Sequence, residues 1–413
     1  MKIRSRPVTL ALTMTAVLAL AACGGSGFDD GEDAEQQDGP AELSILIGSS
    51  GPAETDAVTA AAAAWAEESG NSATVTAAQD LAQQLSQGFA AGSPPDVFYV
   101  SSDLVASYAA NGSLEPYAGE LDNADDFYPN LREAFTVDDE FYCAPKDFST
   151  LALVINTASW EAAGLSDADV PTTWEELATI AQTLTTPEQA GLATSTEYQR
   201  LGAFMAQAGG GLVTDGEATA ASAENLEALN YVKSVVDAGA WSFASDLDSG
   251  WAGEAFGTGR AAMTIEGNWM IGAMAADYPD IDFQVVPLPE GPAGPATLTF
   301  TNCWGIAAGN PDIDAARDLV EFLTSTDQQL EFASAFGVMP SVESAADQWR
   351  TDNPDAAAFL DQAEFASAVP NQEGVSDVIA DLNAQLESLR SGDPQAILDS
   401  AQSNLEAALQ AGE

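Results

Sequence analysis

Polar and aromatic side chains stand beside several stretches that the sequence predicts to be β-strands, and together they could bind a ligand rich in hydroxyl groups. Hydroxyls, carboxylates and amides exchange hydrogen bonds with such a ligand, and an indole face covers the apolar C–H face of a ring. In open α/β sheets the ligand crevice lies beyond the carboxyl ends of the strands. The segments at these positions are 48–50, which contains Ser49, 101–103, the expected turn 147–150, and 266–269.

Several side chains in and near these segments are candidates for either binding or a structural role. Trp269 follows a strand and opens a helix, and we expect it to stack on the ligand rather than in the core. Glu266 either caps that helix or faces the ligand, and Asp103 either favours a helix N-terminus or binds hydroxyls. Further binding candidates, at a strand end, beside a strand or in a glycine-rich loop, are Tyr99, Trp304, Trp251 and Glu254.

The chain contains no histidine. This absence excludes Ser-His-Asp and Cys-His catalysis and removes the commonest metal ligand. The acidic run 122–126 lacks the spacing, glycine and terminal glutamate of a calcium loop, so we expect no metal and no cofactor. Cys143 and Cys303 are the cysteines beyond the N-terminal region. In an exported protein they more often form a disulfide than remain two buried thiols.

The elements that would position these residues follow from an alternation of β-rich runs and helical patterns. Such alternation predicts an α/β fold with parallel strands and helical crossovers. Thr173 and Glu176 form a capping box that opens a helix through Leu184, and after residue 312 the pattern becomes almost wholly helical. The expected strands are 43–47, 73–76, 96–100, 151–155, 262–265, 283–286 and 304–308, with further helices near 54–68 and 81–91.

The formal charge of −53 is carried by a chain that is 46% hydrophobic, so the sequence predicts a folded protein with an acidic surface. Nucleic acid is excluded as a partner, because phosphate binding requires clustered lysine and arginine. We interpret the carboxylates as a halophilic adaptation, in which cations screen the self-repulsion.

The N-terminus is typical of a lipoprotein leader. Lys2, Arg4 and Arg6 precede an apolar run over 8–22, and Leu-Ala-Ala-Cys closes this run at Cys23. The run is too short to span a bilayer, which needs about 20 residues. We therefore expect residues 1–22 to be a signal peptide, Cys23 to be lipidated, and 23–40 to be a flexible acidic tether on the extracellular face of the cell membrane.

Several segments in the body of the chain resemble the family 1 extracellular solute-binding proteins, the maltose-binding-protein-like receptors of ABC sugar importers. They include Gly-Ser-Pro-Pro-Asp-Val at 92–97, Pro-Lys-Asp-Phe-Ser-Thr at 145–150, Glu-Gly-Asn-Trp at 266–269 and Gly-Val-Met-Pro-Ser at 337–341. The resemblance implies a two-lobe periplasmic-binding-protein-like fold, each lobe being a mostly parallel sheet flanked by helices. The chain would cross the hinge between the lobes more than once. Lobe one would comprise 41–149 with 305–340, and lobe two 150–304 with the helical C-terminal part 341–413.

The resemblance also implies a function and further site residues. A monomeric, non-enzymatic receptor would capture a sugar or short oligosaccharide between its lobes and deliver it to a membrane permease. Asp147 and Ser149 would lie in a crossing between lobes, and Tyr198 and Gln199 match a region that lines the cleft in relatives. Trp304 and the two cysteines would lie near crossings, where Trp304 either binds or packs. The acidic surface departs from relatives with lysine-rich surfaces.

Two alternatives remain open from the sequence. Aromatic rings with carboxylates could hold a betaine or polyol in the same fold, a betaine through cation–π attraction. A secreted glycoside hydrolase would also use aromatic side chains and paired carboxylates.

Overall fold

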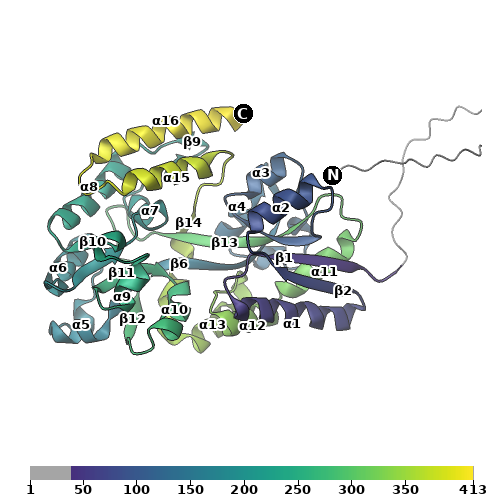
Figure 1. The fold of residues 1–413 in the computed structure, drawn as a ribbon, viewed down its shortest axis with the longest axis horizontal. Helices are drawn as coiled ribbons and strands as arrows, with labels where there is room; N and C mark the ends of the chain where they lie inside the picture. Colours follow the sequence, from purple (N-terminus) through teal and green to yellow (C-terminus); the bar gives the residue numbers. More distant parts are fainter. Residues whose placement is uncertain (1–38, 413) are drawn as a thin grey trace, which may run out of the picture. The chain divides into compact units, whose positions relative to one another are not determined.

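The computed structural model describes residues 39–412, in which ten strands form one mixed, mostly parallel sheet flanked by helices (Figure 1). The order is β10-β7-β11-β6-β13-β3-β1-β2, with β12 beside β6 and β14 beside β13. The strands are β1 Glu42–Ile47, β2 Ser72–Ala77, β3 Val97–Ser101, β6 Ala144–Asn156, β7 Ala190–Thr194, β10 Trp241–Phe243, β11 Ala261–Gly267, β12 Phe283–Val286, β13 Thr297–Ile306 and β14 Ala366–Ala368. Two short hairpins are β4 Thr136–Val137 with β5 Glu140–Phe141, and β8 Val213–Thr214 with β9 Glu217–Ala218.

The two long strands β6 and β13 run antiparallel through the middle of the sheet and connect its two ends. β6 is buried along nearly its whole length, as expected for a central strand covered on both faces. The prediction of a turn at 147–150 is therefore wrong. These residues continue β6, because β13 pairs with residues 144, 145 and 147–150.

Two large hydrophobic cores divide the helices between the ends of the sheet. The first core draws on 41–144 and 303–345, and we call this part lobe one; the second draws on 151–298 and 375–405, and we call it lobe two. Lobe one contains α1 Pro52–Ser69, α2 Leu81–Ala90, α3 Val105–Ala110, α4 Pro129–Ala134, α11 Ile313–Leu323 and α12 Thr326–Phe336. Lobe two contains α5 Thr157–Ala162, α6 Trp174–Leu184, α7 Tyr198–Gln207, α8 Ala223–Asp237, α15 Val375–Leu386 and α16 Pro394–Gly412.

A third, smaller core adjoins both lobes. It collects Leu131 and Phe148 with side chains of four helices, α9 Ala252–Gly257, α10 Trp269–Asp277, α13 Ala346–Asp352 and α14 Ala357–Asp361. The helix predicted to end at Leu184 is confirmed as α6, whose N-cap Thr173 accepts a hydrogen bond from the backbone N–H of Glu176.

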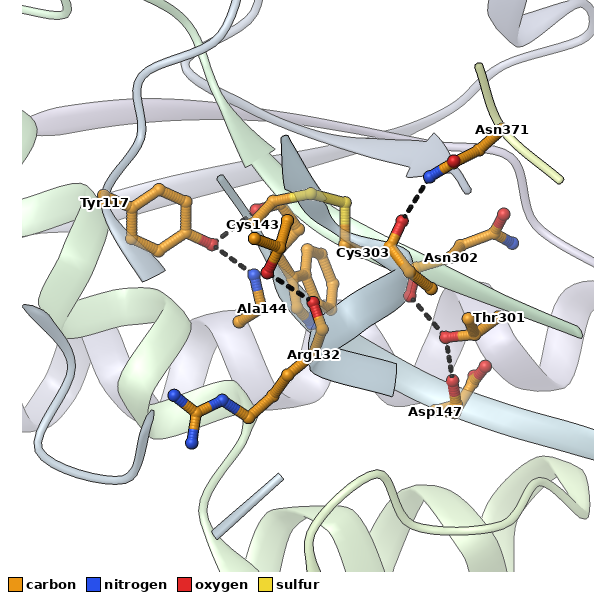
Figure 2. Close-up of a disulfide and its surroundings, with 12 residues drawn as sticks. Tyr117, Arg132, Cys143, Ala144, Asp147, Thr301, Asn302, Cys303 and Asn371 are labelled. Carbon is orange, nitrogen blue, oxygen red and sulfur yellow. Dashed lines mark hydrogen bonds between the residues drawn. A yellow bond between two sulfur atoms is a disulfide. The ribbon is translucent and has the colours of Figure 1, made fainter. Parts of the chain in front are cut away.

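Cys143 and Cys303 form a disulfide between the residue that precedes β6 and the C-terminal part of β13 (Figure 2). Their Cα atoms are 5.6 Å apart across 160 positions of sequence. Both cysteines are fully buried in the core of lobe one. The signal peptide, the lipidation of Cys23 and nearly all of the expected tether lie outside the described residues.

Candidate functional site

A cavity of about 530 Å³ lies between the two lobes, beside β6 and β13. Its walls come from the ends of β1 and β3 in lobe one, from α7 and α15 in lobe two, from α10 of the third core, and from the central strands. The position agrees with the rule that ligands bind beyond the carboxyl ends of strands. The lining residues from lobe one and β6 are Gly48, Ser50, Glu54, Ser101, Ser102, Asp103, Lys146, Asp147, Ser149, Phe336, Gly337 and Val338. Those from lobe two and β13 include Gln199, Asn268, Trp269, Thr299, Phe300, Thr301, Asn302, Ser376, Ile379 and Asn383.

Trp269 supplies the main aromatic surface of the cavity. It is the first residue of α10, and 36% of its surface is exposed, which makes it one of two exposed large hydrophobic side chains in 39–412. Its ring packs against Phe300 in a T-shaped arrangement, with the ring centroids 5.5 Å apart. Indole rings combine a large apolar face with one polar N–H, so an exposed one inside a polar cavity suits stacking on a ring.

Glu266 lies behind Trp269 and is fully buried, in β11. Its Oε2 accepts hydrogen bonds from Trp269 Nε1, at 3.1 Å, and from Arg200 Nη2, at 2.8 Å. Burial raises the pKa of Glu266 above its usual value, although the charge and hydrogen bonds of Arg200 oppose that rise. Glu266 therefore neither caps α10 nor lines the cavity. It binds the side chain of Trp269 instead.

A buried ionic cluster forms the floor of the cavity on the side of lobe one. Lys146 Nζ lies 3.0 Å from Glu54 Oε1 and also contacts Asp147 Oδ2. Glu54 Oε2 accepts hydrogen bonds from the backbone and hydroxyl of Ser50, both at 2.7 Å. The ammonium group also lies 4.7 Å from the centre of the Tyr99 ring, close enough for cation–π attraction.

The three ionisable groups of this cluster have different electrostatic surroundings. Burial raises the pKa of Glu54, but Lys146 and the bonds from Ser50 outweigh it and hold that pKa below its usual value. Burial lowers the pKa of Lys146, and the two carboxylates more than compensate, so the net shift is upward. For Asp147 burial outweighs the attraction of Lys146, and its pKa is raised. The cluster therefore holds Lys146 charged.

The structure brings five of the residues predicted from the sequence to the cavity. Trp269, Asp103, Asp147, Ser149 and Gln199 all line it. Asp147 and Ser149 do so from the strand β6, and Gln199 does so from α7, where its Oε1 accepts a hydrogen bond from Asn383 Nδ2 at 3.0 Å. Their role in binding remains a prediction.

Two predicted residues of lobe one lie next to the cavity but serve the protein's own contacts. Ser49 donates a hydrogen bond to the Gly51 carbonyl at 2.7 Å and accepts one from Thr55. Tyr99 is buried, and its hydroxyl donates to Glu54 Oε1 at 3.0 Å. They lie outside the cavity lining, and Tyr99 acts on it only through Glu54.

The remaining predicted residues are placed elsewhere in the chain. Trp304 packs in the core of lobe one, 4.8 Å from the Tyr99 ring, so of its two predicted roles the structure shows packing. Tyr198 is buried in the core of lobe two. Trp251 packs against the third core, and Glu254 accepts a hydrogen bond from the backbone N–H of Gly250 at 2.6 Å. The indole and carboxylate of that loop thus have partners within their own segment and core.

Sequence reasoning missed several residues of the site, above all Glu54, Lys146 and Arg200. One signal was available, since Lys146 and Lys233 are the lysines that follow the leader, and Lys146 stands beside a candidate carboxylate. No pattern in the sequence singles out Glu54, which lies in the first turn of a helix, or the residues that α15 contributes.

Comparisons with known proteins agree with this architecture. A family model for bacterial extracellular solute-binding proteins matches residues 60–358. The diacetylchitobiose binding protein DasA of Streptomyces coelicolor is 23% identical over 343 residues, which cover 79% of this chain and 80% of that protein. Within 39–412, no helix is both long and apolar enough to cross a membrane.

Two solved structures share the fold. The cyclic α-maltosyl-1,6-maltose binding protein of Arthrobacter globiformis superposes with a TM-score of 0.79 and 24% identity, covering 90% of this chain and 100% of that chain. UgpB of Mycobacterium tuberculosis, solved in complex with glycerophosphocholine, has a TM-score of 0.77 and 21% identity, covering 90% and 99%.

Proposed function

The chain belongs to the bacterial extracellular solute-binding proteins, and we propose that it captures a neutral sugar or short oligosaccharide between its lobes for delivery to an ABC permease. The single observation that carries this proposal is the partly exposed indole of Trp269 in a cavity lined with hydroxyls, amides and carboxylates from both lobes. A ligand that contacts both lobes favours the closed form, because only differential contact shifts such an equilibrium.

The charges of the cavity support a ligand without net negative charge. Glu54, Asp103 and Asp147 line it, and Lys146, which is the cation among the lining residues described, is already held by two of these carboxylates. A phosphate or carboxylate group on the ligand would meet this excess of negative charge without a free cation to pair with. Phosphorylated sugars and uronates therefore fit poorly.

The same observation favours a second candidate, a solute with a quaternary ammonium group. Trp269 supplies an aromatic face, and Asp103 is a cavity-lining carboxylate at the end of β3. Such a pair can hold a cationic head group by cation–π and charge attraction. The structural neighbour UgpB was solved with glycerophosphocholine, which carries such a group.

Catalysis of glycoside hydrolysis is a weaker proposal for this cavity. That reaction needs one free carboxylic acid and one free carboxylate on opposite sides of the bond. Glu54 and Asp147 share Lys146 as partner, and Glu54 also accepts two hydrogen bonds from Ser50. Neither carboxylate is therefore free for this reaction.

The proposed sugar receptor is a monomer. It is anchored on the extracellular face of the cell membrane through a lipidated Cys23, with residues 23–40 as its tether.

A ligand screen on the purified protein tests the proposal. Mono-, di- and oligosaccharides, polyols and betaines are compared by thermal shift, because a bound ligand stabilises the folded state by mass action. We expect saccharides to raise the melting temperature and chromogenic glycosides to remain uncleaved. A screen in which only betaines stabilise the protein would favour the second candidate instead.

Substitution of Trp269 then locates the site. Trp269→Ala should weaken saccharide affinity by roughly 1–3 kcal/mol, the range for loss of a large buried contact. Trp251→Ala is the matched control, since Trp251 lies outside the cavity lining, and it should leave affinity unchanged. Equal affinities for wild type and Trp269→Ala would remove Trp269 from the site.

A further inference from the structure

Two of the groups that contact the indole of Trp269 do not themselves line the cavity. The guanidinium carbon of Arg200 lies 5.1 Å from the centre of the indole, within cation–π range. Arg200 belongs to α7 and Glu266 to β11, and both stand outside the cavity lining as described. Their side chains are 12% and 0% exposed.

Arg200, Glu266 and Trp269 form a closed triangle of interactions. Glu266 Oε2 accepts hydrogen bonds from Arg200 Nε at 3.2 Å and Nη2 at 2.8 Å, and from Trp269 Nε1 at 3.1 Å. Glu266 Oε1 is buried without a hydrogen-bond partner in the described structure. Every hydrogen bond of this carboxylate is therefore made by the two groups that it joins. A buried carboxylate is costly unless it is paired, so its placement requires Arg200.

The backbone beneath the indole leaves it little freedom. A Cβ atom added to Gly267 would lie 2.1 Å from Cζ3 of Trp269, closer than real Cβ atoms approach. The indole also packs against Phe300 of β13 in a T-shaped arrangement. Thus the glycine backbone, the Phe300 ring and the Arg200–Glu266 pair together fix the orientation of the indole.

We propose that Arg200 and Glu266 are positioning residues, which hold the Trp269 indole in a fixed orientation as a binding platform without touching the ligand. The inference rests on the proposed function in one respect, namely that the platform serves a ligand. The orientation of the ring is a property of the unliganded protein. A fixed platform loses less conformational freedom on binding than a mobile one, and this improves affinity.

The first experiment needs no ligand. The indole N–H resonance of Trp269 is identified by its loss in Trp269→Phe, and its chemical shift and hydrogen exchange are followed in variants. Arg200→Met combined with Glu266→Gln removes both charges and leaves no buried carboxylate unpaired. We expect a shifted, faster-exchanging indole N–H in this double variant, with partial return in Arg200→Lys. An unchanged resonance and exchange rate would overturn the proposal.

The second experiment measures affinity for maltotetraose and diacetylchitobiose by calorimetry. The double variant should bind the better probe up to about tenfold more weakly, the scale of one aromatic contact. Gly267→Ala should have a similar effect, because the added methyl displaces the ring. The control Arg317→Met, which loses a 2.7 Å ion pair with Glu120 away from the cavity, should keep wild-type affinity.

A double-mutant cycle separates positioning from a general structural effect. In the Trp269→Ala background, removal of Arg200 and Glu266 should cause no further loss of affinity, since they act through the ring. The same fold loss in both backgrounds would overturn the proposal. If wild type bound neither saccharide, the proposed sugar function would fail, while the indole measurement would still decide the positioning role.

Discussion

Replacing Lys146 with methionine removes the cation of the buried cluster and keeps most of the side-chain volume. The lysine side chain is 8% exposed and that of Glu54 is 3% exposed. Without Lys146, both Glu54 and Asp147 remain in the cavity floor as carboxylates without a paired cation. Breaking a buried ion pair by removing one partner costs about 3–5 kcal/mol. We expect Lys146→Met to lower the free energy of unfolding by about that amount at neutral pH.

The pH dependence of that loss follows from the directions of the pKa shifts. The lowered pKa of Glu54 gives stability that is complete above its ordinary 4.5 and is lost as pH falls through the folded pKa. The raised pKa of Lys146 gives stability that is complete below its ordinary 10.5 and is lost as pH rises through the folded pKa. The contribution of Asp147 to stability has the opposite sign to that of Glu54. Because the pKa of Asp147 is raised in the folded protein, its ionisation as pH rises above its ordinary 3.8 lowers the stability of the fold.

In Lys146→Met the attraction that holds both carboxylates ionised is gone. Their pKa values should rise, and protonation in mild acid should then remove the buried charges. The difference in unfolding free energy between wild type and variant should therefore shrink as pH falls into the acid range. Adding Glu54→Gln and Asp147→Asn to the variant should recover most of the loss, since uncharged amides replace the unpaired carboxylates.

The assay is guanidinium unfolding of the unliganded protein across a pH series, followed by circular dichroism. Lys233→Met is the matched control, because the partly exposed Lys233 makes only a 3.5 Å pair with Asp237 one turn away and a contact with the Arg390 carbonyl. It should cost about 0.5 kcal/mol or less. A loss below about 1 kcal/mol for Lys146→Met, or a loss that grows in acid, would refute the assignment of Lys146 as the charge that compensates the cluster.

Three further predictions concern the fold and surface. Replacing Cys143 and Cys303 by serine removes the disulfide and should lower the free energy of unfolding, measured by thermal unfolding, by about 2–4 kcal/mol. Saccharide affinity measured by calorimetry should stay unchanged, because both residues lie in the core of lobe one, and a shifted affinity would contradict this. Gly191→Ala should lower the free energy of unfolding, measured with a denaturant, by about 1–3 kcal/mol or more, because the added Cβ would lie 1.8 Å from the Ala181 carbonyl oxygen. Gly272→Ala, with open space around the added methyl, is the control and should not destabilise α10. The melting temperature should rise from low to molar salt, because added cations screen the repulsion of a chain with a net charge of −53. The protein's own cations cannot do so, since all eight cationic side chains of 39–412 already contact carboxylates or carbonyls. A melting temperature that does not change with salt would argue against a salt-adapted surface.

Local sequence patterns predicted the elements well where one element's own residues determine it. The strand 283–286 is confirmed as β12, and 43–47 and 73–76 are confirmed within one residue at each end as β1 and β2. The long strand β6 was missed in its first half, because its residues 147–150, three of them polar, read as a turn. Only pairing with β13, about 150 residues further along the chain, makes that segment a strand.

The candidate site was predicted in part for a similar reason. Asp103 and Trp269 follow strands, where the crevice rule applies, and both line the cavity. Tyr99 and Trp304 are also near strand ends, but they pair in register on adjacent strands and face the core. Because side chains alternate between the faces of a sheet, a shift of one residue decides between core and cavity. The sequence alone does not determine that register.

The ionic contacts that shape the site join residues far apart in the chain. Glu54 and Lys146 are 92 positions apart, and Arg200 and Glu266 are 66 apart. Neither pair belongs to a local motif such as a helix turn, where spacing would reveal it. Each contact exists because the sheet brings two elements together, so it could be found only after the topology was known.

The proposed closure has to bend the segments that join the lobes, and their contacts limit where bending can occur. On the lobe-one side, Cys303 is tied to Cys143 and pairs with Val100 of β3. Next to this anchor, on the side of lobe two, the register between β13 and β6 shifts between Cys303 and Asn302. The hydroxyl of Thr301 then donates a hydrogen bond to the Asp147 carbonyl at 2.7 Å (Figure 2).

The same point of β6 is held by a third segment. Ser341 donates to the Pro145 carbonyl at 2.6 Å, and Gln329 donates to the Lys146 carbonyl at 2.8 Å. Phe148 also exchanges two backbone hydrogen bonds with Met339. These bonds and the disulfide attach β6 up to Phe148 to the lobe-one segment 303–345, so bending should begin beyond it, around 149–150 and 299–300. Those residues include Ser149, Thr299 and Phe300, which line the cavity. A ligand that contacts them would therefore touch the bending segments themselves, and this is how binding could be coupled to closure.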